Sequence, residues 1–110
     1  DKFIWIHLEN IESLNIEQNL IKIFNNNSFF GLKKVKKLKY ENFHLKEIWS
    51  EAFSPLLSFS YIYLYFAYHK IELIQPFAFS DLKKLTMMNL QNNNLIFIDN
   101  NTFSGLVSLE

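Results

Sequence analysis

The chain has 110 residues, of which 49% are apolar and 20% charged, and its 11 lysines balance 11 acidic residues to a net charge of zero. This composition predicts one folded domain rather than disorder. Zero net charge and the absence of arginine argue against nucleic acid as a partner, and the absence of cysteine excludes disulfides, thiolate metal sites and cysteine nucleophiles from this stretch.

An aromatic residue recurs at matched points along the chain. Each copy is followed three residues later by Leu and six residues later by another apolar side chain. The five aromatics are Trp5, Phe29, Phe53, Phe79 and Phe103. Such a recurrence indicates stacked solenoid units, none of which can bury its apolar face alone.

The repeats follow one another in register from the N-terminal end. Residues 1–10 fit the tail of a preceding repeat, four copies follow at 11–34, 35–60, 61–84 and 85–108, and residues 109–110 begin another. The period from Leu85 to Leu109 is 24 residues, whereas the step from Val35 to Tyr61 is 26, with the excess expected near residues 57–60.

Each copy fits the frame L-x-x-L-x-L-x-x-N-x-L-x-x-I-x-x-x-x-F-x-x-L, most clearly between residues 85 and 109. There L-T-M-M-N-L-Q-N-N-N-L is followed by I-D-N-N-T-F-S-G-L-V-S-L, and the tails F-F-G-L, F-S-P-L, F-S-D-L and F-S-G-L repeat the same ending. Over residues 5–110 the chain resembles the leucine-rich repeat family, in the 24-residue typical class of animal extracellular proteins. The resemblance, with a chain that starts at Asp1 and ends within a motif, predicts an internal fragment of a longer protein.

The resemblance implies an α/β repeat solenoid shaped as a horseshoe. A parallel β-sheet is expected on the concave face, and loops or short helical turns are expected on the convex face. The five aromatics are expected to stack into a spine. In this family cysteines concentrate in flanking caps, so a cysteine-free stretch is compatible with secretion.

An asparagine position follows each concave strand, where a turn leaves backbone groups that need partners. An Asn side chain offers both a donor and an acceptor. Asn19 and Asn93 fit this structural ladder, His69 can replace part of it, and Phe43 cannot. The ladder is therefore expected to be interrupted in the middle of the chain.

The concave strands are expected to present ligand-facing residues at alternate positions, as in the family. The candidates form one patch across neighbouring strands: Lys37, Lys39, Tyr63, Tyr65, Met87 and Asn89. Exposed Tyr and Met beside charged groups are typical of protein-binding surfaces. The alternative is that tyrosines simply suit a β-surface and shield the sheet.

Five lysines gather between residues 33 and 39 and raise the possibility of polyanion binding. Because they straddle a return turn and a strand start, where a solvated surface is expected, we favour an ordinary solvated surface. The partner prediction is accordingly a protein ligand, no nucleic acid, and neighbouring repeats or caps outside the chain.

Two N-x-[ST] sequons predict glycosylation at Asn26 and Asn100. Both asparagines occupy position 16 of their repeats, on the outer return loop, where a glycan is tolerated. The alternative is that an asparagine-rich chain produces sequons by chance.

Catalysis and metal binding have no support, because His7, His44 and His69 fall at unrelated repeat positions without a nucleophile and base pattern. No enzyme activity, cofactor or metal is predicted. The aromatic run at residues 59–68 is too short to span a membrane, which takes roughly 20 residues, and its alternation predicts a strand with one buried face.

These features predict a non-catalytic protein–protein recognition module of an extracellular receptor or adhesion-type protein, secreted or part of an ectodomain, with its ligand on the concave face. Two alternatives remain open: a structural matrix or spacer array without a specific ligand, and an intracellular leucine-rich repeat scaffold or regulatory subunit.

Overall fold

Short strands recur, one in each repeat, around the apolar centre of the L-x-L motif. In the computed structural model, which describes residues 10–16, 21–40, 44–56, 63–66 and 70–110, these strands are β1 (Ser13–Ile16), β3 (Lys37–Tyr40), β5 (Tyr63–Tyr65) and β7 (Met87–Asn89). Leu14 and Leu38, at the centres of β1 and β3, are buried. Side chains alternate along a strand, so burial of these two leucines fixes which face of the sheet packs on the core.

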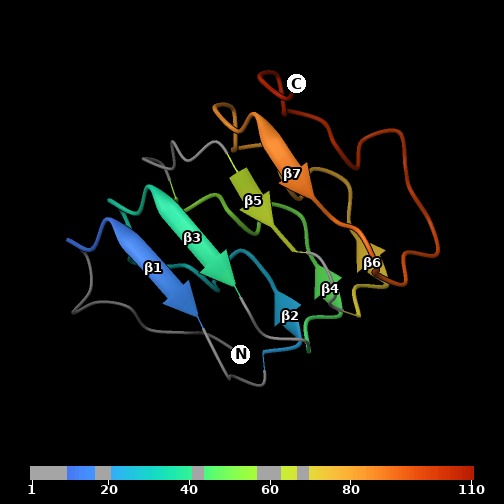
Figure 1. Ribbon diagram of the computed structural model, residues 1–110, viewed down its shortest axis with the longest axis horizontal. Coiled ribbons are helices and arrows are strands. Elements are labelled where there is room, and N and C mark those ends of the chain that lie inside the picture. Colours follow the sequence, from blue (N-terminus) through green and yellow to red (C-terminus); the bar gives the residue numbers. More distant parts are fainter. Residues whose placement is uncertain (1–9, 17–20, 41–43, 57–62, 67–69) are drawn as a thin grey trace.

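The strands of this first layer run parallel, and their register follows the repeat. Ser13 lies opposite Lys37 in the β1–β3 pair, and Tyr63 lies opposite Met87 in the β5–β7 pair, so both pairs join residues 24 positions apart. Strands β3 and β5 lie side by side between the two pairs (Figure 1). The four strands therefore form the predicted concave face.

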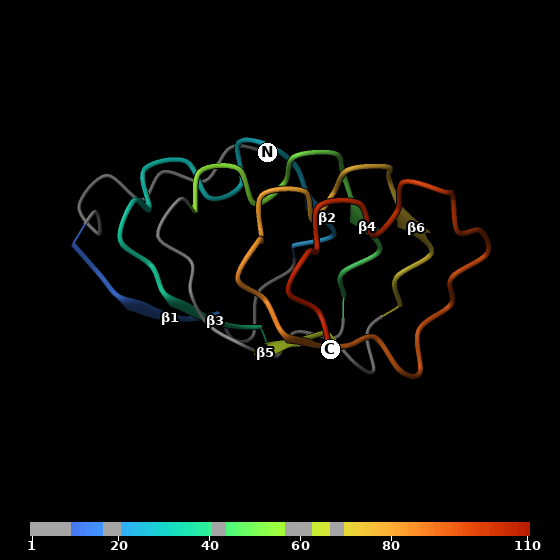
Figure 2. The ribbon, with the colours of Figure 1, turned by 90° about the horizontal axis from the view of Figure 1, so that it is seen from above.

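A second layer of three two-residue strands runs along the other side of the coils (Figure 2). It consists of β2 (Ile23–Phe24), β4 (Glu47–Ile48) and β6 (Leu73–Ile74), all parallel. Ile23 pairs with Glu47, 24 positions on, and Glu47 pairs with Leu73, 26 positions on. The two extra residues therefore enter between β4 and β6, and the segment predicted to hold them, 57–60, lies outside the described residues.

The return halves of the first three repeats contain turns and these short strands, that of the fourth contains turns, and no helix occurs in the described part of the chain. Of the loops or short helical turns expected here, the described residues form turns and strands, because backbone donors bond to the preceding repeat. The Lys46 N–H donates to the Lys22 carbonyl, and the Glu72 N–H donates to the Lys46 carbonyl, each at 2.8 Å. In a helix, these N–H groups would donate to carbonyls of the same segment instead.

The aromatic spine connects successive repeats through face-to-face rings. Centroids lie 5.5 Å apart for Phe29 and Phe53, 5.8 Å for Phe53 and Phe79, and 6.2 Å for Phe79 and Phe103, with interplanar angles of 17°, 16° and 3°. Trp5 lies outside the described residues. Phe24 and Phe66 pack against this stack from the interior, 6.3 and 6.1 Å from Phe53.

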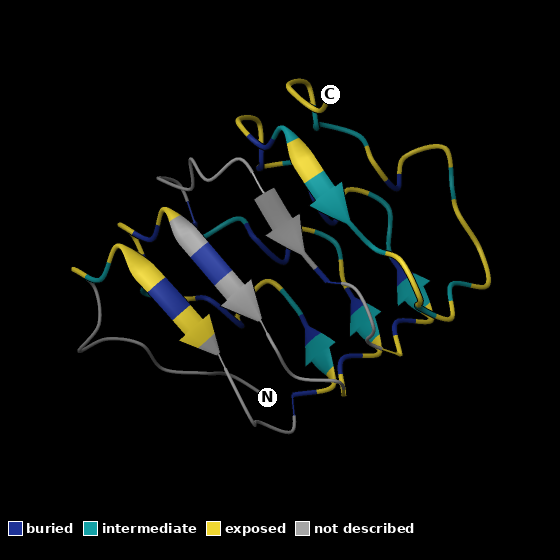
Figure 3. Cartoon of the chain, in the orientation of Figure 1, coloured by how far each residue is buried: buried dark blue, intermediate teal, exposed yellow. Residues whose placement is uncertain are grey.

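Burial ends abruptly at the last repeat. Phe29, Phe53 and Phe79 are almost fully buried, whereas the equivalent Phe103 is 38% exposed. Ile98 is likewise exposed, although its counterpart Ile74 is buried. Figure 3 shows this change along the C-terminal loop, which is exposed over most of its length. This end of the solenoid is therefore an open apolar edge.

Candidate ligand-binding face

The exposed side of the concave sheet is polar at one end and mixed at the other. Ser13 and Asn15 on β1 are exposed, Met87 on β7 is 50% exposed, and Asn89 is partly buried. The Asn89 side-chain oxygen accepts a hydrogen bond from the Gln91 N–H at 3.0 Å, which fixes the amide at the end of β7.

Backbone register brings the predicted patch residues together in two groups. Tyr63 lies opposite Met87 and Tyr65 opposite Asn89, while Lys37 and Lys39 lie opposite Ser13 and Asn15. Paired strands lie about 4.8 Å apart. For Lys37, Lys39, Tyr63 and Tyr65 the structure describes the backbone, so ligand contact by these residues stays a prediction.

Asn93 links the third and fourth repeats through a single side chain. Its Oδ1 accepts from the Ile71 N–H at 3.1 Å, and its Nδ2 donates to the carbonyls of Phe66 and Leu90 at 2.8 and 2.9 Å. Both ends of the amide are thus satisfied by backbone groups of two repeats. Asn19, Phe43 and His69, the other positions of the predicted ladder, lie outside the described residues.

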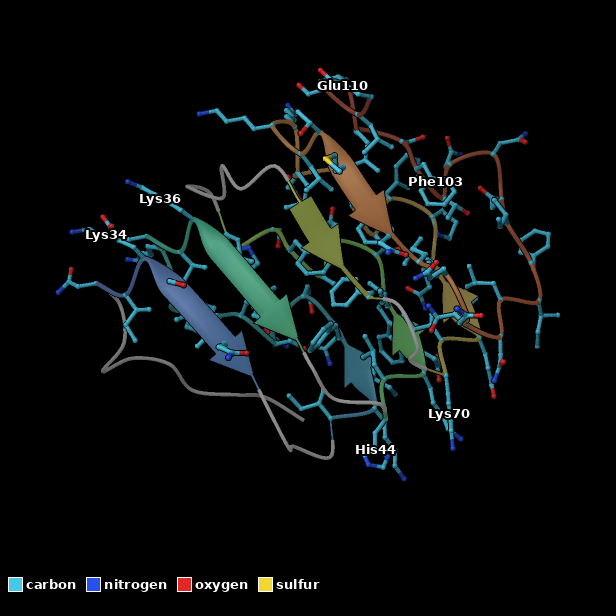
Figure 4. The ribbon with its side chains drawn as sticks, viewed as in Figure 1. Lys34, Lys36, His44, Lys70, Phe103 and Glu110 are labelled. Carbon is cyan, nitrogen blue, oxygen red and sulfur yellow. The ribbon has the colours of Figure 1, made fainter. Side chains whose placement is uncertain are left out.

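Exposed lysines line the end of the sheet where the strands begin. Lys34 and Lys36 lie beside the starts of β1 and β3 (Figure 4), and both are exposed, as is Lys33. The Lys34 ammonium donates to Asn10 Oδ1 at 3.1 Å, and Lys36 lies 3.6 Å from a Glu12 carboxylate oxygen. Both interactions are exposed, and such pairs contribute little to stability.

A second pair of exposed lysines, Lys83 and Lys84, precedes β7 just as Lys33 and Lys34 precede β3. We call the group the basic rim: Lys33, Lys34, Lys36, Lys83 and Lys84. The second pair is not part of the lysine run between residues 33 and 39, so sequence reasoning missed it, although its matching repeat position could have revealed it.

The outer turns that carry the two sequons share one geometry. In the first, the Asn25 N–H donates to Ser28 Oγ at 2.8 Å and the Asn27 N–H donates to Asn25 Oδ1 at 2.9 Å. In the second, the Asp99 N–H donates to Thr102 Oγ1 at 2.8 Å and the Asn101 N–H donates to Asp99 Oδ1 at 2.7 Å. We call these two turns the hydroxyl-closed turns.

The two middle repeats close their outer turns differently, because alanine replaces the hydroxyl residue at positions 52 and 78. There the N–H that would meet the hydroxyl donates to the preceding repeat: Trp49 to the Phe24 carbonyl and Gln75 to the Ile48 carbonyl, each at 2.8 Å. Glu51 and Phe77 take positive φ values of 59° and 63° in these turns. The sequons therefore coincide with one of two turn types.

Metal-binding geometry is not found in the described ranges, which hold no cluster of three or more His, Cys, Asp or Glu side chains. His44 is exposed, and His7 and His69 lie outside those ranges. The described part of the chain also has no helix long and apolar enough to cross a membrane.

Comparison with known proteins agrees with this geometry. Residues 62–110 match the family model described as leucine rich repeat, and those residues contain β5, β6 and β7 with the Asn93 bridge. The fold is a leucine-rich repeat solenoid.

Solved structures and curated relatives extend the match across the whole chain. A crystal structure of a TLR13–ssRNA13 complex aligns with 99% of this chain, and the alignment takes in 18% of the matched chain of that structure. The TM-score is 0.63 and the identity 23%. Toll-like receptor 3 of Bos taurus is 31% identical over 110 residues, which are all of this chain and 10% of the relative. Toll-like receptor 3 of Boselaphus tragocamelus is 27% identical over 108 residues, 92% of this chain and 12% of the relative.

The leucine-rich repeat chain thus spans about a tenth of the length of the curated relatives that it matches. Those relatives bear the name of a receptor, which agrees with a recognition module. The prediction that nucleic acid is not a partner is wrong as an exclusion, because TLR13, which shares the fold, is found in complex with single-stranded RNA. Zero net charge does not exclude such a partner, because it averages over the surface, whereas the lysines of the basic rim are concentrated at one end of the sheet.

Proposed function

We propose that this chain is part of the recognition module of a receptor and that its concave sheet, β1, β3, β5 and β7, contributes to the ligand-binding surface. The observation that supports the proposal most directly is the alignment of all 110 residues with Toll-like receptor 3 at 31% identity. The exposed Met87 and the register that sets Tyr63 and Tyr65 beside β7 support the concave face.

The proposed setting is extracellular or the lumen of an endosome, on the outer side of a membrane-anchored receptor. The repeats are proposed to be of the 24-residue typical class, which the 24-residue pairing offsets of β1–β3 and β5–β7 support. A stable interface buries about 800 Å² per partner. Four short strands offer less surface area than a stable interface buries, so further repeats of the whole receptor are expected to share the interface.

Photo-crosslinking from single positions of the full-length receptor tests the concave face. A crosslinking residue in place of Met87 faces the concave side, and the same residue in place of Lys46, which is exposed beside β4, is the matched control. We expect ligand-dependent crosslinks from position 87 and not from position 46, with mass spectrometry identifying what is attached. Crosslinks from position 46 alone would contradict a concave site.

The basic rim supports a second candidate, the binding of single-stranded nucleic acid along the end of the sheet where the strands begin. The complex of TLR13 with single-stranded RNA is the observation that favours it. Lys33, Lys34, Lys83 and Lys84 recur at matched repeat positions and are all exposed, as phosphate-binding residues must be.

Salt-dependent binding of a labelled single-stranded RNA to the full-length receptor tests this candidate. Replacing the four lysines with Gln should weaken binding and lower the slope of log K against log salt by about 0.7 for each phosphate that is no longer neutralised. Gln replacements at Lys22, Lys46 and Lys70, which are exposed elsewhere, are the control, and the two sets are compared per lysine replaced. Equal weakening per lysine in both sets would show non-specific attraction rather than a rim site.

A further inference from the structure

In each hydroxyl-closed turn, the asparagine of the sequon is exposed while its Ser or Thr is buried. Asn26 and Asn100, the acceptor residues, are exposed, whereas Ser28 and Thr102, the residues that complete the sequons, are buried to 1% and 0% exposure. Each hydroxyl oxygen also accepts a backbone N–H at 2.8 Å. The sequon motif requires Ser or Thr two residues after Asn, so the transferase must contact that hydroxyl. In the folded turn the hydroxyl is buried and the transferase cannot contact it.

Because Asn26 and Asn100 are exposed, the folded turn has room for a glycan that is already attached to either side chain. Position 16 lies on the outside of the turn, away from the stacked rings, and its backbone neighbours are held by Asn25 and Asp99 without help from the acceptor side chain. A bulky substituent can therefore remain on the closed turn. The glycan can therefore be attached before the turn closes but not afterwards.

We propose that Asn26 and Asn100 are N-glycosylation sites that accept their glycan only before the surrounding turn closes. The inference rests on the proposed extracellular or lumenal setting. In the transfer, the asparagine side-chain nitrogen attacks the anomeric carbon of an oligosaccharide carried on a lipid diphosphate. A C–N bond forms, the C–O bond to the diphosphate breaks, the electron pair leaves with the lipid diphosphate, and the amide proton passes to a base of the transferase.

The backbone hydrogen bonds within each turn add a second reason for this order. Ser28 and Thr102 directly precede the spine rings Phe29 and Phe103, and in each turn the backbone N–H of the hydroxyl residue donates to a carbonyl three residues earlier. The Ser28 N–H lies 3.0 Å from the Asn25 carbonyl, and the Thr102 N–H lies 3.1 Å from the Asp99 carbonyl. Exposing the hydroxyl thus requires the turn to open locally, and closed turns populate open forms rarely. Folding of the repeat and transfer of the glycan therefore compete for the same residues.

An acceptor assay with purified transferase and a lipid-diphosphate oligosaccharide tests the order. The acceptors are the full-length receptor made in a bacterial host, where its sequons stay bare, and unstructured peptides of residues 21–32 and 95–106. We expect the folded receptor to be modified at Asn26 and Asn100 at least about tenfold more slowly than the peptides. Equal rates, or no transfer to either peptide, would overturn the proposal.

Two variants loosen the turns without touching the sequons. Asn25→Ala and Asp99→Ala each remove one side-chain acceptor of the turn, and we expect transfer to the adjacent site in the folded receptor to accelerate about three- to tenfold. Asn94→Ala, at an exposed position outside both turns, is the matched control and should leave the rate unchanged. An unchanged rate in the loosened variants would overturn the proposal, because turn closure would then not limit transfer.

Mass spectrometry of the receptor from its native cells completes the test. Glycan on Asn26 and Asn100 is expected, and bare asparagines on a receptor recovered from the secretory pathway would overturn the proposal. A receptor recovered from the cytosol would contradict the proposed setting alone, because the ratio of peptide to folded rates in the acceptor assay does not depend on compartment.

Discussion

Asn93 satisfies backbone groups of two repeats at once, so its removal takes a hydrogen-bond partner from groups on both sides of a repeat boundary. Asn93→Ala removes an acceptor from the Ile71 N–H and donors from the Phe66 and Leu90 carbonyls. We expect the free energy of unfolding to fall by about 1–3 kcal/mol, measured by urea denaturation. Asn94→Ala, at an exposed neighbour, is the control, and equal destabilisation in both variants would remove the bridging role.

Gly105 is required by close backbone approach as well as by its conformation. Its φ is +92°, and a Cβ there would lie 2.5 Å from the Ser80 Cα and carbonyl oxygen of the preceding repeat. Gly105→Ala should lower stability by more than about 2 kcal/mol, since left-handed strain and overpacking each cost about 1–3 kcal/mol. Thermal unfolding checks this, and a melting temperature unchanged from the parent would show that the two backbones can separate freely.

At the scale of elements, the spine rings should differ in their energetic weight by position. Phe53 stacks between Phe29 and Phe79, while Phe103 has a stacked partner on one side and is 38% exposed. We expect Phe53→Ala to cost about 3–5 kcal/mol and Phe103→Ala distinctly less. Denaturant unfolding of both variants compares them, and equal costs would mean that stacking contributes little beyond simple burial.

The sequence predicted the strands around the L-x-L motif and the bridging role of Asn93, and it missed the two-residue strands of the second layer. The position of Phe53 within the frame predicted the spine, and Leu14 and Leu38 predicted the centres of the concave strands. The strands β2, β4 and β6 were not predicted, because a two-residue strand has almost no internal pattern and forms through bonds to its neighbour. The two turn types could have been predicted, since hydroxyl residues and alanines occupy one frame position: Ser28, Ala52, Ala78 and Thr102.

The candidate site was predictable to a similar degree. Alternation along β7 correctly put Met87 on the exposed side. The basic rim was only half recognised, because Lys33 and Lys34 were weighed as a local run while Lys83 and Lys84 lie 50 residues further on. Stacking of repeats brings such pairs onto one edge, and a net charge summed over the chain conceals them.

At the scale of the whole molecule, the open C-terminal edge determines how the isolated chain behaves. Ile96, Phe97 and Val107 are 83, 61 and 79% exposed, and a solenoid end normally carries a polar cap. We expect the isolated 110-residue chain to associate with rising concentration, followed by light scattering. Ile96→Glu should reduce association, whereas Gln91→Glu, which adds the same charge on the concave side, should not. A monodisperse chain at high concentration would contradict the expectation.

The spacing of the stacked rings has a geometric consequence for the shape of the repeat array. Neighbouring rings lie 5.5 to 6.2 Å apart, whereas paired strands lie about 4.8 Å apart. Each repeat is therefore a wedge, wider at its aromatic side than at its strand side by about 1 Å. Stacking such wedges bends the array toward the strands. The bulk of one phenylalanine per repeat thus contributes to the curvature of the arc. Replacing Phe29, Phe53 and Phe79 together with Leu should open the arc, as small-angle X-ray scattering would record.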